Sequence, residues 1–390
     1  MNPSAQGWIN KLLTQVDQNN LISKYDEASF YNALRASGFI YGNNLSVVTD
    51  AVEKRDLTEG ELSKTNLLIA FLHTHHYSKS DQPFIESVVG FYAAINALKT
   101  SFFQELLGGI LPSEQLEKII HKRIQIDPNL LTKNFNYFII NALLYVDVLA
   151  YAEYLKVESI TTDFIKNLEI AIASISLEVL NSKQVKNQYD ESLIKLFEAS
   201  SRYQDGNYIS YQEAVIFINT PLKKYYMLDL ACMASWSDKI IDKSERQFLL
   251  KLGGSLKLTK QNVSTSIETI HEFYTTNKDK IALLSSKNMV QSFYNNSSKI
   301  VTTLISRNSK RLYQELKDSK ELMVLLTQST TRDLTQEEQK KVNEQLLDIF
   351  KTIPSLAIVL LPGGALLLPF IIKFIPKLLP SAFDENRIEE

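Results

Sequence analysis

Helix-breaking residues are scarce and unevenly placed in this sequence. Only 12 glycines and 10 prolines occur among 390 residues, and half of the prolines stand between 350 and 383. Elsewhere, segments such as 83–111 repeat apolar residues at spacings of three and four, which is the period of an amphipathic helix. Patterns typical of β-strands are nearly absent. The sequence therefore predicts an all-α fold of multi-helix bundles, with a proline-broken hydrophobic helical segment near the C-terminal end.

Composition and charge limit the partners that this chain can have. With 45% hydrophobic and 22% charged residues it is globular, and its length suffices for two or three packed units. A net charge of -2 gives no general basic field for nucleic acid, so we expect no direct sequence-specific nucleic-acid partner. The single Cys232 fits a reducing compartment. The first 20 residues lack the basic and apolar regions of a signal peptide, so we expect a cytoplasmic location.

Turn signals divide the chain. Gly108 and Gly109 suit the end of one helix, and Ser113 suits the N-cap of the next. We expect three parts, namely an N-terminal helical bundle over 1–130, a middle helical region over 131–300 and a C-terminal segment over 301–390.

Two features concern helices of the middle region. Segment 134–155 is apolar on nearly all faces but includes Asp147 and Glu153, so we interpret it as a buried bundle helix rather than a membrane span. Gly253 and Gly254 predict another helix end.

Motifs for catalysis are missing from the sequence. It has no glycine-rich phosphate loop and no nucleophile elbow. The cluster from His73 to His76 could share a metal, but a helix would turn only two of its imidazoles to one side, and we interpret it as a solvated helix end. We therefore expect no enzymatic activity and no cofactor.

An acidic turn stands in the stretch "ASWSDKIIDKSERQFLLKL", residues 234–252. It resembles the TerB-like family of tellurite-resistance helical bundles, whose turn has the form D-G-x-[IV]-D-x-x-E. Asp238, Asp242 and Glu245 match this form, and Lys239 replaces the glycine. The resemblance implies metal or stress sensing, with these three carboxylates as the metal ligands. The alternative is that Asp242 caps the amides at the start of a helix.

The proline-broken segment carries no charge from 352 to 372. A helix of this length spans about 31 Å, close to the thickness of a hydrocarbon core. Helix breakers are tolerated in a membrane where neighbouring helices satisfy the freed carbonyls, and flanking lysines suit its interface. The alternative is a soluble hydrophobic hairpin buried in the bundle. The residues assigned to the membrane segment are Pro354, Pro362, Gly363, Gly364, Pro369, Lys373, Phe374, Pro376, Lys377 and Pro380.

Three segments stand in order near the end of the chain: "KRLYQELKD", "RDLTQEEQKK" and "DIFKTIPSLAIVLLPGGALLLPFIIKFIPKLLPSAF". They resemble the LETM family, the leucine-zipper and EF-hand transmembrane proteins of mitochondrial inner membranes. The resemblance implies cation/proton exchange, ribosome binding at the membrane, or both. The family usually carries a glutamate where this chain has Ala365, so we expect anchoring rather than transport. In the family the ribosome-binding domain follows the signature that ends here at Phe383, and this chain stops seven residues later, so we expect it to keep only the anchor and its approach helices.

The combination resembles bacterial LETM-related proteins that are described as biofilm-associated. We therefore expect a non-enzymatic helical protein that is peripheral to the inner membrane or spans it once, with partners in the ribosome or another protein and a role in biofilm or ion homeostasis. Two alternatives stay open. One is a soluble TerB-like module for stress response or metal sensing, and the other is a subunit of a cation/proton exchanger.

Overall fold

The computed structural model describes residues 2–49, 57–99, 111–124, 133–203, 210–236, 241–278, 280, 289–353, 356 and 367–379. These residues form seventeen α-helices and one short 3-10 helix, and they contain no strand. The all-α prediction is confirmed.

The chain forms two compact units, each assembled from three separate stretches. Unit 1 consists of 1–165, 220–230 and 265–285. Unit 2 consists of 166–219, 231–264 and 286–390. The division of the sequence at 130 and 300 stays a prediction.

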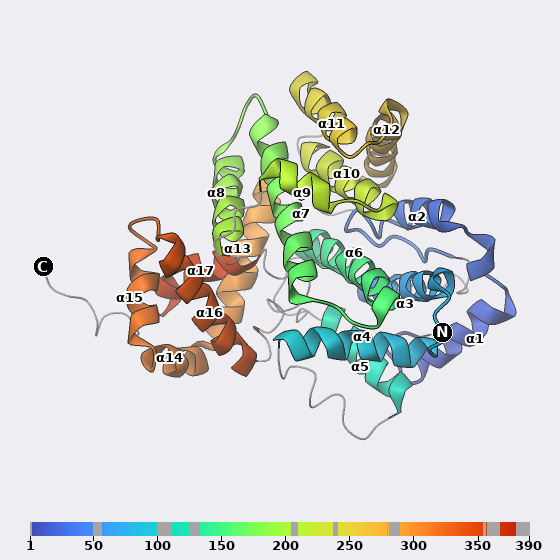
Figure 1. Ribbon diagram of the computed structural model, residues 1–390, viewed down its shortest axis with the longest axis horizontal. Coiled ribbons are helices and arrows are strands. Elements are labelled where there is room, and N and C mark those ends of the chain that lie inside the picture. The colour runs from blue at the N-terminus through green and yellow to red at the C-terminus, as the bar shows by residue number, and fades with distance from the viewer. Residues whose placement is uncertain are drawn as a thin grey trace, which may run out of the picture. The chain divides into compact units, whose positions relative to one another are not determined.

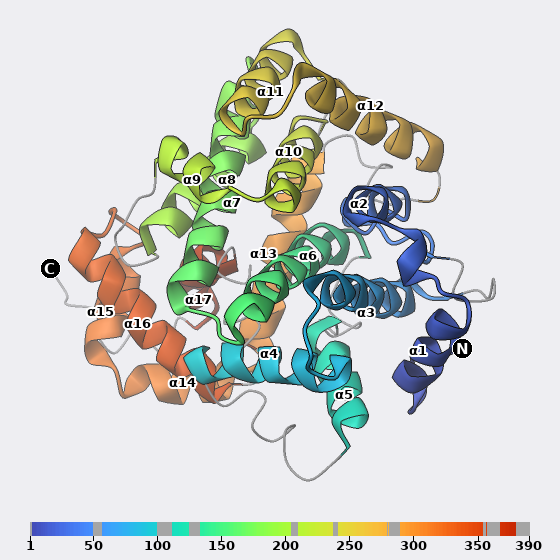
Figure 2. The same ribbon diagram turned by 45° about the vertical axis from the view of Figure 1, so that its right-hand side comes forward.

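Unit 1 is built mainly from the N-terminal helices. Its two central helices, α3 and α6, pack along each other in both views (Figures 1 and 2). Helix α3 begins at a capping box, because Thr58 accepts from the amide of Glu61 and Glu61 accepts from the amide of Thr58. The elements of this unit are α1 (Trp8–Gln18), η1 (Ile22–Lys24), α2 (Glu27–Ala36), α3 (Glu59–Ser78), α4 (Phe84–Lys99), α5 (Pro112–Ile124) and α6 (Lys133–Val157), with parts of α10 (Pro221–Ser235) and α12 (Lys260–Asn277).

A buried ion pair joins α2 to α10 in the core of unit 1. Nε and Nη2 of Arg35 donate to the two carboxylate oxygens of Asp229 over 2.7 and 2.9 Å. The hydroxyl of Tyr31 donates to the same carboxylate over 2.7 Å. Arg35 also donates to Ser266. Because a buried charge is costly unless it is paired and hydrogen-bonded, this network fixes how the two helices meet.

A second pair of the same kind joins α5 to α6. Arg123 donates to both oxygens of Asp147 over 2.6 and 3.0 Å, and Tyr92 donates to the same carboxylate. Both charged side chains are fully buried. Asp147 belongs to the apolar segment 134–155, and its environment agrees with the interpretation of that segment as a buried helix of the bundle.

The histidine cluster is part of the packing of unit 1. His73 is buried and stacks on Phe30 with 3.8 Å between the ring centroids. Burial lowers the pKa of His73 to about 4, so its imidazole is neutral at physiological pH. The Nε2 atom of His75 lies 2.9 Å from the carbonyl oxygen of Gln82. The prediction of a solvated helix end is therefore wrong for His73, which is buried in the packing at the end of α3.

Unit 2 contains the remaining helices. Its longest described helix, α7, is followed by α8, which contacts α13, α16 and α17. The elements are α7 (Thr162–Ser182), α8 (Gln188–Tyr203), α9 (Tyr211–Phe217), α11 (Lys243–Ser255), α13 (Met289–Arg307), α14 (Ser309–Lys317), α15 (Lys320–Gln328), α16 (Gln336–Thr352) and α17 (Leu368–Leu378), with the end of α10 and the start of α12.

Two expected helix ends differ from the structure. Helix α5 begins at Pro112, so Ser113 lies within its first turn and is not the N-cap. Proline suits this first position because its missing amide would have no partner there. Helix α11 continues through Gly253 and Gly254 to Ser255. Gly253 is buried, and a Cβ atom there would overlap Cγ2 of Val263 on α12. This glycine therefore permits close packing of two helices rather than ending one.

The two neighbouring glycines of α11 give a matched test of this packing. We expect Gly253→Ala to destabilise the protein by about 1 to 3 kcal/mol, because Val263 is buried and β-branched and has little room to move. Gly254→Ala meets no atom within 4 Å and should stabilise by up to about 1 kcal/mol. Urea denaturation of both variants measures the difference. Equal effects would contradict the proposed close approach.

Candidate functional site

The last four helices form one packed group within unit 2. Helix α17 contacts α8, α13 and α15, and helix α16 contacts α8, α14 and α15. Helices α15 and α16 run side by side in both views (Figures 1 and 2). The C-terminal part of the chain is therefore an integral part of this unit.

Helix α17 lies towards the C-terminal end of the proline-broken segment, and most of its residues are buried. Pro369 lies in its first turn, where no intrahelical partner for an amide is lost, and Pro376 lies in its last turn. Only Pro369 is placed where a helix tolerates it, because Pro376 lies inside the helix and removes one intrahelical hydrogen bond. The buried residues of the helix are Leu368, Pro369, Phe370, Ile371, Ile372 and Ile375.

Tyr294 of α13 contacts two residues of α17, Lys373 and Phe370. The ammonium of Lys373 donates to the hydroxyl of Tyr294 over 2.8 Å and lies 5.4 Å from the centre of its ring. The ring of Tyr294 also packs against Phe370 on α17 and Tyr189 on α8. Because Lys373 is only half-buried, this hydrogen bond satisfies its charge at the edge of the packed group.

The structure divides the residues assigned to a membrane segment into two groups. Pro369, Lys373, Phe374, Pro376 and Lys377 lie on α17, where the Lys377 ammonium is 5.9 Å from the Phe374 ring centre. Among the described residues, no helix has both the length and the apolarity that crossing a membrane requires. The others lie outside the described residues: Pro354, Pro362, Gly363, Gly364 and Pro380.

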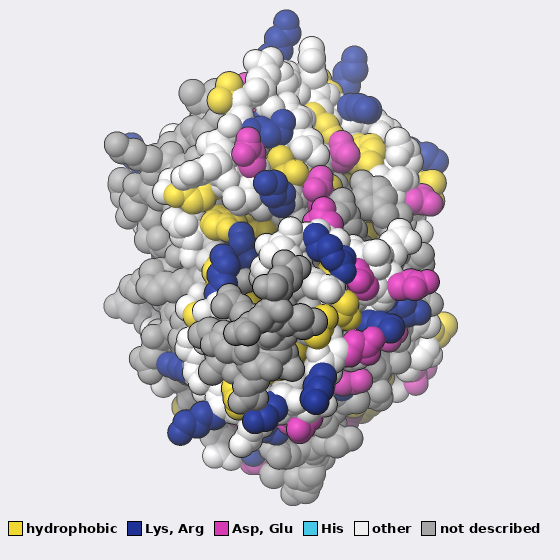
Figure 3. Space-filling model, turned by 90° about the vertical axis from the view of Figure 1, so that its left-hand side faces the viewer, with side chains coloured by type: hydrophobic (Ala, Val, Ile, Leu, Met, Phe, Trp, Pro, Cys, Tyr) yellow, Lys and Arg dark blue, Asp and Glu magenta, His cyan; other side chains and the backbone are white. Residues whose placement is uncertain are grey.

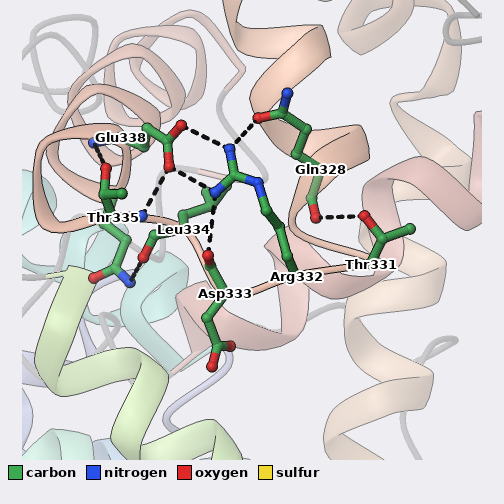
Figure 4. A network of polar contacts seen from close by, with 8 residues as sticks. Gln328, Thr331, Arg332, Asp333, Leu334, Thr335 and Glu338 are labelled. Atoms are coloured by element: carbon green, nitrogen blue, oxygen red, sulfur yellow. Dashed lines mark hydrogen bonds and ion pairs between the residues drawn. The ribbon is translucent and has the colours of Figure 1, made fainter.

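A network of hydrogen bonds between polar side chains fixes the turn between α15 and α16 (Figure 4). The guanidinium of Arg332 donates to both carboxylate oxygens of Glu338, over 2.7 and 2.9 Å. It also donates to the side chain of Gln328 at the end of α15 and to the carbonyl of Asp333. One cation therefore joins the end of one helix, the turn and the start of the next.

The start of α16 carries a capping box. Thr335 accepts from the amide of Glu338, and Glu338 accepts from the amide of Thr335. Hydrogen bonds from Arg332 and from the amide of Thr335 lower the pKa of Glu338 to about 2. Gln339 adds a bond to the carbonyl of the buried Leu334. The beginning of α16 is thus fixed by local chemistry, as the S/T-x-x-E pattern at Thr335 requires.

The outward side of α16 is charged. Lys341 pairs with Glu321 of α15 over 2.7 Å, and both side chains are about half exposed, so this pair contributes little to stability. Glu337, Lys340 and Glu344 are exposed at spacings of three and four and therefore lie on one side of the helix. These three residues form a charged stripe, with acidic and basic side chains, that a partner can contact.

The structure describes two of the three carboxylates of the acidic turn within 234–252. Asp242 and Glu245 form a capping box at the start of α11, in which each side chain accepts from the other residue's amide over 2.8 Å. Asp238 lies outside the described residues. Within the part of the chain that the structure describes, no three histidine, cysteine or acidic side chains gather as a metal site would require. The two described carboxylates therefore act as caps.

Comparison with known proteins gives one result for this part of the chain. Residues 334–390 match the family described as LETM1-like, RBD, where RBD is the ribosome-binding domain. No curated protein and no solved structure matches the chain. The chain thus carries a LETM1-like C-terminal segment, which includes α16 and α17.

This match corrects one expectation. We expected this chain to stop before the family's ribosome-binding domain, but the segment that matches this domain begins at Leu334 and contains Phe383. The hydrophobic run is therefore within the family's segment rather than ahead of it. The matching segment begins within the turn that the bond from Arg332 to Glu338 fixes, because Leu334 lies between these two residues.

Sequence reasoning missed the hydrogen bonds that fix this turn. It used "RDLTQEEQKK" only as part of a family pattern, although Thr335 and Glu338 form a readable capping box within it. The bond from Arg332 to Glu338 spans six residues across a turn and needs the folded geometry. No local pattern predicts it.

The low pKa of Glu338 predicts a pH-dependent stability. Its contribution is present above the ordinary carboxyl pKa of 4.5 and is lost as the pH falls through about 2, where the folded protein takes up the proton. We expect Glu338→Gln to lower the denaturation midpoint above pH 4.5, and we expect this difference to vanish towards pH 2. Glu344→Gln, which changes an exposed carboxylate of the same helix, serves as the control. A difference that is constant from pH 2 to 6 would contradict the ion pair.

Proposed function

We propose that this protein binds ribosomes through unit 2, with the outward side of α16 as the contact surface. The match of residues 334–390 to a ribosome-binding domain family carries this proposal. The proposed role is binding rather than catalysis.

The burial of α17 supports a polar contact surface. The apolar side chains of this helix are used in packing against α8, α13 and α15. The exposed residues in the described part of the matched segment include the charged stripe of Glu337, Lys340 and Glu344. Figure 3 looks onto the side of the molecule where α14 to α17 lie in Figure 1, and side chains of both charges are interspersed there. Such surfaces give specificity and speed of association through complementary charge.

Sedimentation with purified ribosomes tests this proposal. We expect the full chain to pellet with ribosomes through a sucrose cushion and to stay in the supernatant without them. The double variant Lys340→Glu, Glu344→Lys keeps the net charge but exchanges two of the three charges of the stripe, and we expect it to bind about tenfold more weakly.

The matched control inverts another exposed pair at the same spacing. Glu191→Lys with Lys195→Glu makes the same exchange on α8 of the same unit and should bind as the natural chain does. Failure of the natural chain to pellet with ribosomes would refute the proposed function. Equal binding by the α16 variant would exclude α16 from the contact.

Membrane association is a second candidate, and the uncharged run 352–372 favours it. We propose that this run mediates attachment when lipid is present. The full chain should then float with lipid vesicles in a density gradient. Leu360→Lys should abolish flotation, because a charge at the bilayer centre costs about 2.5 to 3.5 kcal/mol. Natural protein that stays at the bottom of the gradient would refute membrane attachment without affecting the ribosome proposal.

A further inference from the structure

Basic side chains gather on α14, just before the segment that matches the ribosome-binding family. Five cations, Arg307, Lys310, Arg311, Lys317 and Lys320, are exposed between the end of α13 and the start of α15. We propose that the three of these on α14, together called the α14 basic stripe (Lys310, Arg311 and Lys317), bind the phosphate backbone of ribosomal RNA. This inference rests on the proposed function and names the component of the ribosome that unit 2 contacts.

The helix directs these side chains away from the packed group. Leu312 and Leu316 are fully buried and form its inner side. Lys310, Gln314 and Lys317 follow at spacings of four and three, so they lie in one line on the opposite side, and Arg311 stands beside that line. At 1.5 Å per residue the line is about 10 Å long, which suits contact with more than one phosphate.

Helix α14 carries three cations and one carboxylate. Lys310 and Arg311 have no carboxylate partner among the described residues. The nearest acidic residue along the helix, Glu315, is half-buried and accepts from the hydroxyl of Thr352. The next, Asp318, is exposed at the end of the helix. In a chain with a net charge of -2, this concentration of cations is a local feature that complements a polyanion.

The neighbouring helix α16 lacks such an imbalance. Its Lys341 and Lys351 are bound to Glu321 and Asp348, and acidic residues alternate with the lysines along its outward side. Helix α14 contacts both α15 and α16, so the stripe has a fixed place beside the matched segment. The two surfaces belong to one packed group and can contact one partner together.

The composition of the stripe favours RNA over a lipid surface. A helix that lies on a membrane turns its apolar side towards the acyl chains. The apolar side of α14 is used inside unit 2, and its exposed side carries lysine, arginine and glutamine. Lysine and arginine with an amide donor are the side chains that contact nucleic-acid phosphates.

Binding to ribosomes at several salt concentrations tests the inference. The test variant is Lys310→Gln, Arg311→Gln, Lys317→Gln in the full chain. Glutamine keeps a high helix propensity, and all three positions are exposed, so folding should be retained. We expect binding at 50 mM salt to weaken at least about tenfold. We also expect the slope of log K against log salt to become shallower by about 2 to 3, because three phosphate contacts are lost.

The matched control removes the same charges from another exposed helix of unit 2. Lys243→Gln, Arg246→Gln, Lys251→Gln on α11 also replaces two lysines and one arginine, and it should leave affinity and salt slope unchanged. A second variant, Lys310→Arg with Lys317→Arg, keeps the charges and should bind as the natural chain does.

Two further probes separate the sources of phosphate. Ribosomal RNA freed of protein should bind the natural chain and should bind the test variant more weakly. Vesicles with anionic lipid should bind both chains equally. Natural protein that binds ribosomes with a salt slope unchanged in the test variant would overturn the inference and leave the proposed function standing. A loss confined to lipid vesicles would also overturn it, and no binding to ribosomes at all would refute both.

Discussion

Unit 2 depends on the burial of α17. This short helix contacts α8, α13 and α15, and most of its side chains are removed from water. Each buried leucine, isoleucine or phenylalanine contributes about 1.5 to 3 kcal/mol by the loss of apolar surface, so α17 is a major source of cohesion for helices that are otherwise amphipathic. Lys373 lies at the edge of this buried surface, where the hydroxyl and ring of Tyr294 satisfy its charge. The outward sides of α14 and α16 are left to interact with partners.

Much of the fold could be read from the sequence. The scarcity of glycine and proline and the apolar spacing of three and four predicted helices throughout, and the described residues are helical or in connecting loops. Capping chemistry was also readable: Asp242 caps α11, and Thr335 with Glu338 begins α16. The placement of Ser113 and Gly253 was wrong, because the rules for helix ends describe local preference. The packing of α11 against α12 decides what a glycine does.

The candidate site was harder to predict. An uncharged run has the same composition whether it packs against lipid or against other helices, so local sequence does not distinguish the buried α17 from a membrane segment. The family pattern identified the segment but not its extent, and the ribosome-binding match begins at Leu334, upstream of where that domain was expected. The bond from Arg332 to Glu338 and the line of cations on α14 required the folded geometry.

The buried pair of Arg35 and Asp229 has a consequence for the order in which the chain folds during synthesis. The two residues are 194 positions apart, and unit 1 needs stretches 220–230 and 265–285 in addition to its N-terminal part. While the first 165 residues emerge, Asp229 has not been made and Arg35 lacks its native partner, so unit 1 can close only after part of unit 2 has been made. A ribosome translating this protein therefore carries a long incomplete chain, and such long-range pairing slows folding relative to helical bundles whose contacts are local.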